Sequence, residues 1–417
     1  MDREYLNADF YAGNKSRQQY APCSQPQPFM KLLSRILRFY AFQVALHIFE
    51  DGPLTLPAAR AYDLVEDYKG STFFDKWDFY GSYDNLTNGD VIWQDRANAT
   101  SDQLAFVNSA GNAIIKVDNT TNVPYNIKRN SVRITTQQAF GVGSLFIADF
   151  IHMPYGCSVW PAFWTRGLSW PEGGEIDIME GVNLMTQNQM ALHTRQGCMN
   201  VAPAAGAQTG TTGTLDCSQG AGCTVLDNST SSFGAGFAQA GGGVFAAQFD
   251  INGIFIWFWP RANIPQSLQQ STSTSPINSL TDWGVPAASY PSTTSCNITN
   301  FFDAQYLVLD VTLCGDWAGV PSIYTPQCAN QGTTGLCYND NVIGPGDRYN
   351  NAYFEIQYVR VYSTAAVINP GSSSSGGPSP TSGGSGSSTT TQPSGSMRTV
   401  ARDIAPWVLW GMLVAVL

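Results

Sequence analysis

Three carboxylates within six residues are the strongest candidates for catalytic groups in this chain. Glu175, Asp177 and Glu180 stand among apolar neighbours, where acidic side chains are rarely placed without a partner or a task. In a regular strand Glu175 and Asp177 share one face, whereas Glu180 would point to the opposite face. A β-bulge near Ile178 and Met179 would return Glu180 to the shared face, and bulges are frequent beside active sites. The spacing therefore predicts three carboxylates that face one groove.

Cleavage of a glycosidic bond with retention of configuration is the chemistry that suits this pattern. One carboxylate attacks the anomeric carbon and another protonates the leaving oxygen, with the two carboxyl groups about 5 Å apart. With the bulge, the Cα atoms of Glu175 and Glu180 are about 13 Å apart along the strand. Two converging Glu side chains narrow that span, and the shorter Asp177 can hydrogen-bond a neighbouring carboxylate. The alternative is a solvated edge strand, but the apolar neighbours and nearby tryptophans favour catalysis.

Several segments around these carboxylates resemble the endo-1,3(4)-β-glucanases of glycoside hydrolase family 16 from bacteria and fungi. The resemblance covers about residues 62–364 and is strongest over residues 155–164, 175–183 and 191–194. Weaker support comes from residues 256–261 and 352–362. The bulged form of the motif is similar to the fungal-type, laminarinase-like members of the family.

The resemblance implies an all-β fold, a β-jelly-roll sandwich with a long open substrate cleft. It also implies Glu175 as nucleophile, Glu180 as acid/base and Asp177 as their assistant. The expected activity is internal hydrolysis of β-1,3- and mixed β-1,3/1,4-glucans, without a cofactor or a catalytic metal. Two alternatives remain open: a cell-wall glucan transglycosylase, and a glucan-binding protein without turnover, which the three carboxylates argue against.

Composition agrees with a β-rich domain that binds a neutral partner. Charged residues make up 12% of the chain, aromatic residues make up another 12%, and glycines number 40, which is typical of a turn-rich β protein. Residues 144–149, 245–249, 253–258 and 306–312 are predicted strands. The net charge of −10, with no basic block near the motif, argues against a nucleic-acid partner. We expect a monomer that binds a β-glucan polysaccharide.

Aromatic side chains near the motif are candidate platforms for glucose rings. Trp160 and Trp164 share one face of a strand, and Trp170 lies in the loop that leads to Glu175. Packing in the core is the usual fate of a single Trp in a sandwich. The resemblance nevertheless favours substrate contacts for these three tryptophans.

Four further residues are weaker candidates for substrate binding. His193 is expected on the strand paired with the catalytic one, where it could hydrogen-bond the leaving oxygen or Asp177, although a lone His is often structural. The others are Asn183, just after the motif, and the pair Trp257 and Arg261, four residues apart on one predicted strand.

Cysteines and glycosylation sequons point to an oxidising compartment. Eight of the nine cysteines fall in the predicted domain and are compatible with four disulfides whose pairing the sequence leaves open. A zinc site is disfavoured, because the chain has no CxxC pair and only three histidines. Sequons in turn-like surroundings occur at Asn85, Asn98, Asn119, Asn228 and Asn297.

The two ends of the chain have the composition of processing segments. Residues 1–61 form an N-terminal extension, with a signal peptide expected over about residues 30–61 because a basic stretch precedes an apolar run. Residues 365–396 form a linker rich in Ser, Gly, Thr and Pro. Residues 397–417 resemble the propeptide of a glycosylphosphatidylinositol (GPI) anchor. These segments predict an extracellular protein of the cell surface or cell wall that is attached to the membrane only through this anchor.

Overall fold

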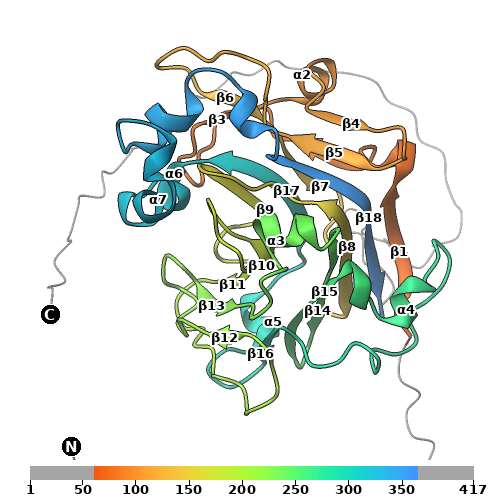
Figure 1. Ribbon diagram of the computed structural model, residues 1–417. Coiled ribbons are helices and arrows are strands. Elements are labelled where there is room, and N and C mark those ends of the chain that lie inside the picture. Colours follow the sequence, from red (N-terminus) through yellow and green to blue (C-terminus); the bar gives the residue numbers. More distant parts are fainter. Residues whose placement is uncertain (1–60, 365–417) are drawn as a thin grey trace, which may run out of the picture. The chain divides into compact units, whose positions relative to one another are not determined.

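Two antiparallel sheets make up most of the computed structural model, which describes residues 61–364 (Figure 1). The first, here called the β8 sheet, runs in the order β16 (Ala288–Pro291), β15 (Gly253–Pro260), β14 (Gly243–Asp250), β8 (Ser144–His152), β18 (Tyr353–Ser363), β5 (Ala113–Lys116) and β4 (Ala105–Val107). β1 (Asp63–Lys69) also pairs with β18. The prediction of an all-β sandwich is confirmed.

The second sheet, here called the β10 sheet, carries the acidic motif. Its order is β12 (Thr211–Thr212), β13 (Cys223–Leu226), β11 (Gln189–His193), β10 (Glu175–Glu180), β9 (Val159–Arg166), β17 (Tyr306–Leu313), β7 (Arg133–Thr136) and β2 (Trp77–Phe79). A small parallel pair joins β3 (Val91–Trp93) and β6 (Arg129–Ser131). The four strands predicted from sequence correspond to β8, β14, β15 and β17.

Short helices lie in the connections between strands. They are α2 (Arg96–Ser101), α3 (Gly234–Gln239), α4 (Gln266–Gln269), α5 (Ile298–Phe301), α6 (Gly315–Ala318) and α7 (Pro321–Cys328). Within residues 61–364, no helix is long and apolar enough to cross a bilayer. The predicted linker and anchor signal, and nearly all of the predicted signal peptide, lie outside the described residues.

The main hydrophobic core lies between the two sheets. Phe150 of β8 packs against Phe163 of β9 with ring centroids 5.7 Å apart, and against Phe245 and Phe354 of its own sheet at 6.0 and 5.4 Å. Side chains alternate along a strand, so the remaining residues of each sheet point away from this core. Each sheet therefore has an outer face. The acidic motif lies on strand β10, so its outward side chains face outward from the β10 sheet.

A second, smaller cluster covers part of the outer face of the β8 sheet. Leu145 and Ile147 alternate with the core residues of β8 and pack with Trp257, Trp259 and Trp283. Trp283 lies edge-on to both other tryptophans, with centroid distances of 5.3 and 5.1 Å. The segment of residues 264–283 thus shields this part of the outer face from water.

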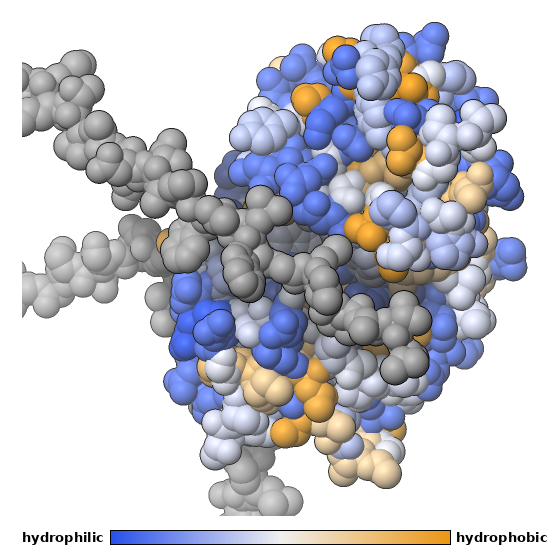
Figure 2. All heavy atoms as spheres, turned by 90° about the vertical axis from the view of Figure 1, so that its left-hand side faces the viewer, coloured by the Kyte–Doolittle hydropathy of each residue, from blue (hydrophilic) through white to orange (hydrophobic). Residues whose placement is uncertain are grey.

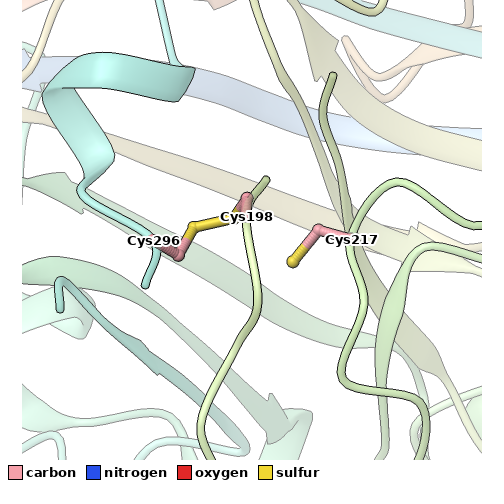
Figure 3. Close-up of side chains that lie close together, drawn as sticks. All are labelled: Cys198, Cys217 and Cys296. Carbon is pink, nitrogen blue, oxygen red and sulfur yellow. A yellow bond between two sulfur atoms is a disulfide. The ribbon is translucent and has the colours of Figure 1, made fainter. Parts of the chain in front are cut away.

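Four disulfides join the eight cysteines of the described region, as their even number predicted. The pairs are Cys157–Cys328, Cys198–Cys296, Cys217–Cys223 and Cys314–Cys337. Figure 3 shows the Cys198–Cys296 bond with Cys217 beside it. Two disulfides therefore lie together next to β11 and β13 and fasten the loop that connects these strands.

The sequons differ in their surroundings. Asn85, Asn228 and Asn297 are exposed in loops, whereas Asn98 is exposed within helix α2 and not in a turn as expected. Asn119 is half-buried, and its Nδ2 atom, to which a glycan would be attached, donates a hydrogen bond of 2.8 Å to Asn350. Glycosylation of these asparagines stays a prediction, with Asn119 the least accessible.

Candidate active site

The acidic strand contains the predicted bulge. Against β9, Asp177 pairs with Trp164 while Met179 pairs with Phe163, so Ile178 is the extra residue. Ile178 and Met179 both belong to the core between the sheets. Because two consecutive residues turn inward, Glu180 regains the outer face that Glu175 and Asp177 occupy. The bulge expected from the residue spacing is confirmed.

A cavity of about 420 Å³ lies over this outer face and is here called the groove. Most of its walls come from neighbouring strands of the β10 sheet and from the loops at their ends. The lining residues are Asp84, Leu86, Thr87, Trp93, Arg133, Trp160, Ala162, Trp164, Trp170, Glu175, Glu180, Gln189, His193, Gly220, Ala221, Asp310, Thr312, Asp316 and Trp317. Apolar residues are scattered among hydrophilic ones on the side of the molecule shown in Figure 2.

All three tryptophans predicted near the motif reach the groove, and each one holds a carboxylate. Trp160 Nε1 donates to Glu180 Oε1 at 2.8 Å, and Trp164 Nε1 donates to Asp310 Oδ2 at 3.1 Å. Trp170, which is half exposed, donates from Nε1 to Glu175 Oε2. The three indoles can therefore orient the acidic groups, and Trp160 and Trp170, which are not fully buried, can also present ring surface to a sugar.

His193 lies where the sequence placed it, on the strand next to the catalytic one. It pairs with Glu175 across β10 and β11, and its Nε2 atom is 3.3 Å from Oδ2 of Asp177. Asp177 is only 1% exposed, and this oxygen accepts no hydrogen bond with good geometry among the described residues. A proton on Nε2 of His193 would therefore stabilise the Asp177 carboxylate.

Burial and mutual repulsion keep protons on the acidic cluster. Burial, with the Asp177 charge as a second cause, raises the pKa of Glu175 to about 8. Burial also raises the pKa of Asp177 to about 7 and that of Glu180 well above its usual range. Like charges this close resist simultaneous ionisation, so at least one group of the cluster keeps its proton near neutral pH. A proton donor is therefore available at the site.

Two sets of three side chains in the described region bring possible metal donors together. Glu175, Asp177 and His193 place donor atoms within 4.8 Å of one another, as do Cys198, Cys217 and Cys296. Cys198 and Cys296 are bonded to each other (Figure 3), and Cys217 is bonded to Cys223, so none of the three can act as a thiolate ligand. Within the acidic set, Glu175 accepts a hydrogen bond from Trp170 and Asp177 lies 3.3 Å from His193, an arrangement that suits proton transfer.

Asn188 is a structural support that the sequence did not reveal. Its Oδ1 accepts a hydrogen bond of 2.8 Å from the Glu180 amide, and its Nδ2 donates one of 2.9 Å to the Ile178 carbonyl. The side chain is fully buried and bridges the two sides of the bulge. A single Asn before a strand carries no signal of such a role.

Asp310, Arg133 and Trp317 are further groove residues that the sequence analysis missed. Asp310 follows the apolar part of a predicted strand, and burial raises its pKa to about 7. The Arg133 guanidinium lies 5.3 Å from the Trp164 ring centroid, and Trp317 meets Trp160 edge-on at 5.5 Å. Trp317 could have been suspected as an aromatic just after the end of a strand, whereas nothing local distinguishes Arg133.

Asn183 is not a substrate contact, which corrects one expectation. It is fully buried, its Oδ1 accepts from the Ser158 amide at 2.8 Å, and its Nδ2 donates to the Ala318 carbonyl at 3.0 Å. Its backbone has a φ of 55°, a left-handed conformation that Asn tolerates better than most residues. Asn183 therefore shapes the turn after β10.

The prediction that Trp257 and Arg261 bind substrate in the groove is also wrong, because neither residue lines it. Trp257 belongs to the cluster on the outer face of the β8 sheet, and its Nε1 donates to the Gly284 carbonyl at 3.1 Å. Arg261 forms an ion pair with Asp149 of β8. Both residues therefore serve the sheet that does not carry the acidic motif.

Comparison with protein families and curated sequences places these features among known enzymes. A family model described as "XgeA-like, catalytic GH16 domain" matches residues 77–362. A Schizosaccharomyces pombe protein named "probable glycosidase" is 42% identical over 310 residues, which are 73% of this chain and 70% of that protein. An Aspergillus niger protein named "probable endo-1,3(4)-beta-glucanase" is 36% identical over 330 residues, covering 77% of this chain. The chain spans only 43% of the length of that second relative.

Two solved structures share the fold over nearly three quarters of the chain. Laminarinase 16A from Phanerochaete chrysosporium, solved with β-glucans in its donor and acceptor sites, is 33% identical with a TM-score of 0.66. The match covers 73% of this chain and all of that structure. An elongating β-1,3-glucosyltransferase is 38% identical with the same TM-score, and the match covers 72% of this chain and all of that one.

Proposed function

The chain belongs to glycoside hydrolase family 16, and we propose that it is a retaining endo-glucanase acting on β-1,3- and mixed β-1,3/1,4-glucans. The observation that carries the proposal is the bulged strand β10, which brings Glu175, Asp177 and Glu180 to one face, with Glu175 and Glu180 in the lining of the groove. Glucanase relatives and the laminarinase neighbour support the substrate class. Because the groove is lined by indoles and polar groups, it suits the apolar faces and hydroxyls of a glucose polymer.

The first step is an attack by Glu175 on the anomeric carbon. The carboxylate oxygen forms a bond to carbon while the glycosidic C–O bond breaks, and its electron pair passes to the leaving oxygen. Glu180 protonates that oxygen as it leaves. Trp170 and Trp160 hold the two carboxyl groups by hydrogen bonds, which fixes their directions before the sugar arrives.

The second step returns the enzyme to its initial state. Once Glu175 is esterified its negative charge is gone, so the proton affinity of Glu180 falls and Glu180 can accept a proton from water. The activated water attacks the anomeric carbon from the side that the leaving group vacated, and Glu175 departs as a carboxylate. Asp177 lies beside Glu175 and His193. It can therefore share a proton with these neighbours as Glu175 loses and regains its negative charge.

Replacement of Glu175 by Gln tests the assignment of the nucleophile. The amide matches the carboxylate in shape but cannot form the glycosyl ester, so activity on laminarin should fall at least about 1000-fold. Activity is measured as new reducing ends, and the initial anomer released by the wild type is identified by NMR. We expect the β-anomer to be released first. An active Glu175→Gln variant would contradict Glu175 as the nucleophile, and an α-anomer released first would contradict a retaining mechanism.

Transglycosylation is a second candidate, favoured by the 38% identity to an elongating β-1,3-glucosyltransferase. In that case a glucan hydroxyl replaces water in the second step, and the same carboxylates act. Sizing of the products from laminari-oligosaccharides separates the two reactions. Products longer than the substrate indicate transfer, whereas only shorter products indicate hydrolysis.

A further inference from the structure

A second cavity lies on the opposite side of the sandwich from the groove. It has a volume of about 520 Å³ and opens on the outer face of the β8 sheet, at the edge of the part covered by residues 264–283. Across this face, Asp149 of β8 pairs with Tyr358 of β18, which pairs with Lys69 of β1. The β4–β5 turn and helix α4 contribute further walls. Three adjacent strands thus form the floor of a polar cavity, here called the outer cavity.

The charges in the outer cavity are largely compensated within it. Arg261 donates two hydrogen bonds, of 2.6 and 2.9 Å, to the carboxylate of Asp149. Arg360 pairs with Asp67 at 3.1 Å, and its guanidinium lies 4.1 Å from the Tyr358 ring centroid. Both arginines are therefore poorly placed to bind an anion, because an anion would have to compete with a carboxylate that is already in place.

Several polar groups at the cavity surface have no hydrogen-bond partner within residues 61–364. These are the Tyr358 hydroxyl, the Gln357 amide and the Lys69 ammonium group, and the last two side chains are exposed. An apolar ligand would remove these groups from water without replacing their hydrogen bonds, which costs free energy. A ligand with many hydroxyl groups and no charge would satisfy donors and acceptors alike. A sugar has that chemistry.

We propose that the outer cavity is a second carbohydrate-binding site that holds a segment of β-glucan. The choice of glucan rests on the proposed function, because the polymer that enters the groove is present wherever the enzyme acts. The groove and the outer cavity lie on the outer faces of different sheets, so neighbouring chains of a glucan particle occupy them. Binding at the outer cavity then raises the effective concentration of polymer at the groove without any contact with the reacting sugar.

A double variant, Lys69→Ala with Gln357→Ala, tests the proposal. Both side chains are exposed and neither lines the groove, so the fold and the catalytic machinery remain intact. The matched control is Lys76→Ala with Gln137→Ala, which replaces the same residue types at exposed positions outside both cavities. Thermal unfolding verifies that both variants are folded.

Binding to insoluble β-1,3-glucan is measured by co-sedimentation, with Glu175→Gln added to each protein so that no substrate is consumed. The Lys69/Gln357 variant should bind at least about 3-fold more weakly than the control variant, whereas with Glu175 restored both should cleave soluble laminarihexaose at wild-type rates. Equal sedimentation of the two variants, or no sedimentation of either, would overturn the second site. Failure of the wild type to cleave any β-glucan would instead overturn the proposed function, so the two failures are distinguishable.

Discussion

Among the individual residues, Glu175 and Glu180 have the same side chain but different partners. Trp170 donates to Glu175, which lies beside Asp177 and faces His193 across the strands. Glu180 is held by Trp160 and by the backbone bond to Asn188. The two glutamates can therefore take different roles although burial raises the pKa of both.

Removal of the Glu180 side chain should affect substrates according to their leaving groups. In Glu180→Ala, hydrolysis of laminarin should fall at least about 100-fold, because general acid catalysis typically contributes that much. Aryl β-glucosides with acidic phenol leaving groups should still form the glycosyl-enzyme, and azide should release it as a β-glycosyl azide. The product is identified by NMR, and an α-azide would show that the first displacement had not occurred at Glu175.

The raised pKa of Glu175 also predicts how stability changes with pH. A carboxyl group whose folded pKa lies above its unfolded value stabilises the fold at low pH, and this contribution is lost as pH rises through the folded pKa. For Glu175 the loss falls between about pH 4.5 and 8. Glu175→Gln cannot ionise, so its melting temperature relative to wild type should be higher at pH 8.5 than at pH 5. Glu172→Gln, at a side chain 66% exposed, is the control and should show no such trend.

At the scale of strands and loops, what the sequence could predict depended on local periodicity. The bulge could be predicted because side chains alternate between the two faces of a strand. Asp177 and Glu180 are three residues apart, so they can share a face only if one extra residue lies between them. Trp257 and Arg261 were misplaced since periodicity shows that a strand has two faces but not which sheet it joins. Asn188, Arg133 and Asp310 reach their positions through pairing between distant strands, which a local pattern does not contain.

The loop closed by Cys217–Cys223 is the element that we expect to position His193. Gly220 and Ala221 line the groove, and Gly222 has a φ of +67°. A Cβ atom on Gly222 would lie 2.6 Å from the Leu192 carbonyl oxygen and 2.9 Å from His193 Nε2. Gly222→Ala should therefore displace the imidazole from Asp177 and lower kcat at least about 10-fold, since misplacements of about 1 Å can cost more than this.

Gly206→Ala is a matched control for this substitution. Its φ is +81°, and a Cβ atom there would meet nothing within 4 Å. Both variants should lose about 1 kcal/mol of unfolding free energy from the left-handed backbone, and Gly222→Ala should lose more because of its contact with the Leu192 carbonyl, but only Gly222→Ala should lose activity in the folded protein. Denaturant unfolding and laminarin kinetics measure the two effects, and equal activity of both variants would contradict a positioning role for the loop.

Considered as a whole molecule, the protein has a net charge of −10 and an acidic groove. Asp84, Asp310 and Asp316 line the groove together with Glu175 and Glu180, whereas Arg133 is the only Lys or Arg in the lining. Such a field repels a polyanion and leaves the approach of a neutral polymer unaffected. The charge of the substrate should therefore matter independently of its linkage.

Carboxymethylation of one β-1,3-glucan isolates this effect, because backbone and linkage stay the same. At low salt, kcat/KM for the carboxymethylated polymer should be at least about 10-fold below that for the neutral one, and 0.5 M NaCl should reduce the difference by screening. Salt should leave the rate on the neutral glucan nearly unchanged. Since carboxymethyl groups also add bulk, a hydroxyethylated glucan of equal substitution is the control for size. A carboxymethylated glucan that is cleaved as slowly as the hydroxyethylated one at every salt concentration would show that size, and not the charge of the groove, sets the preference.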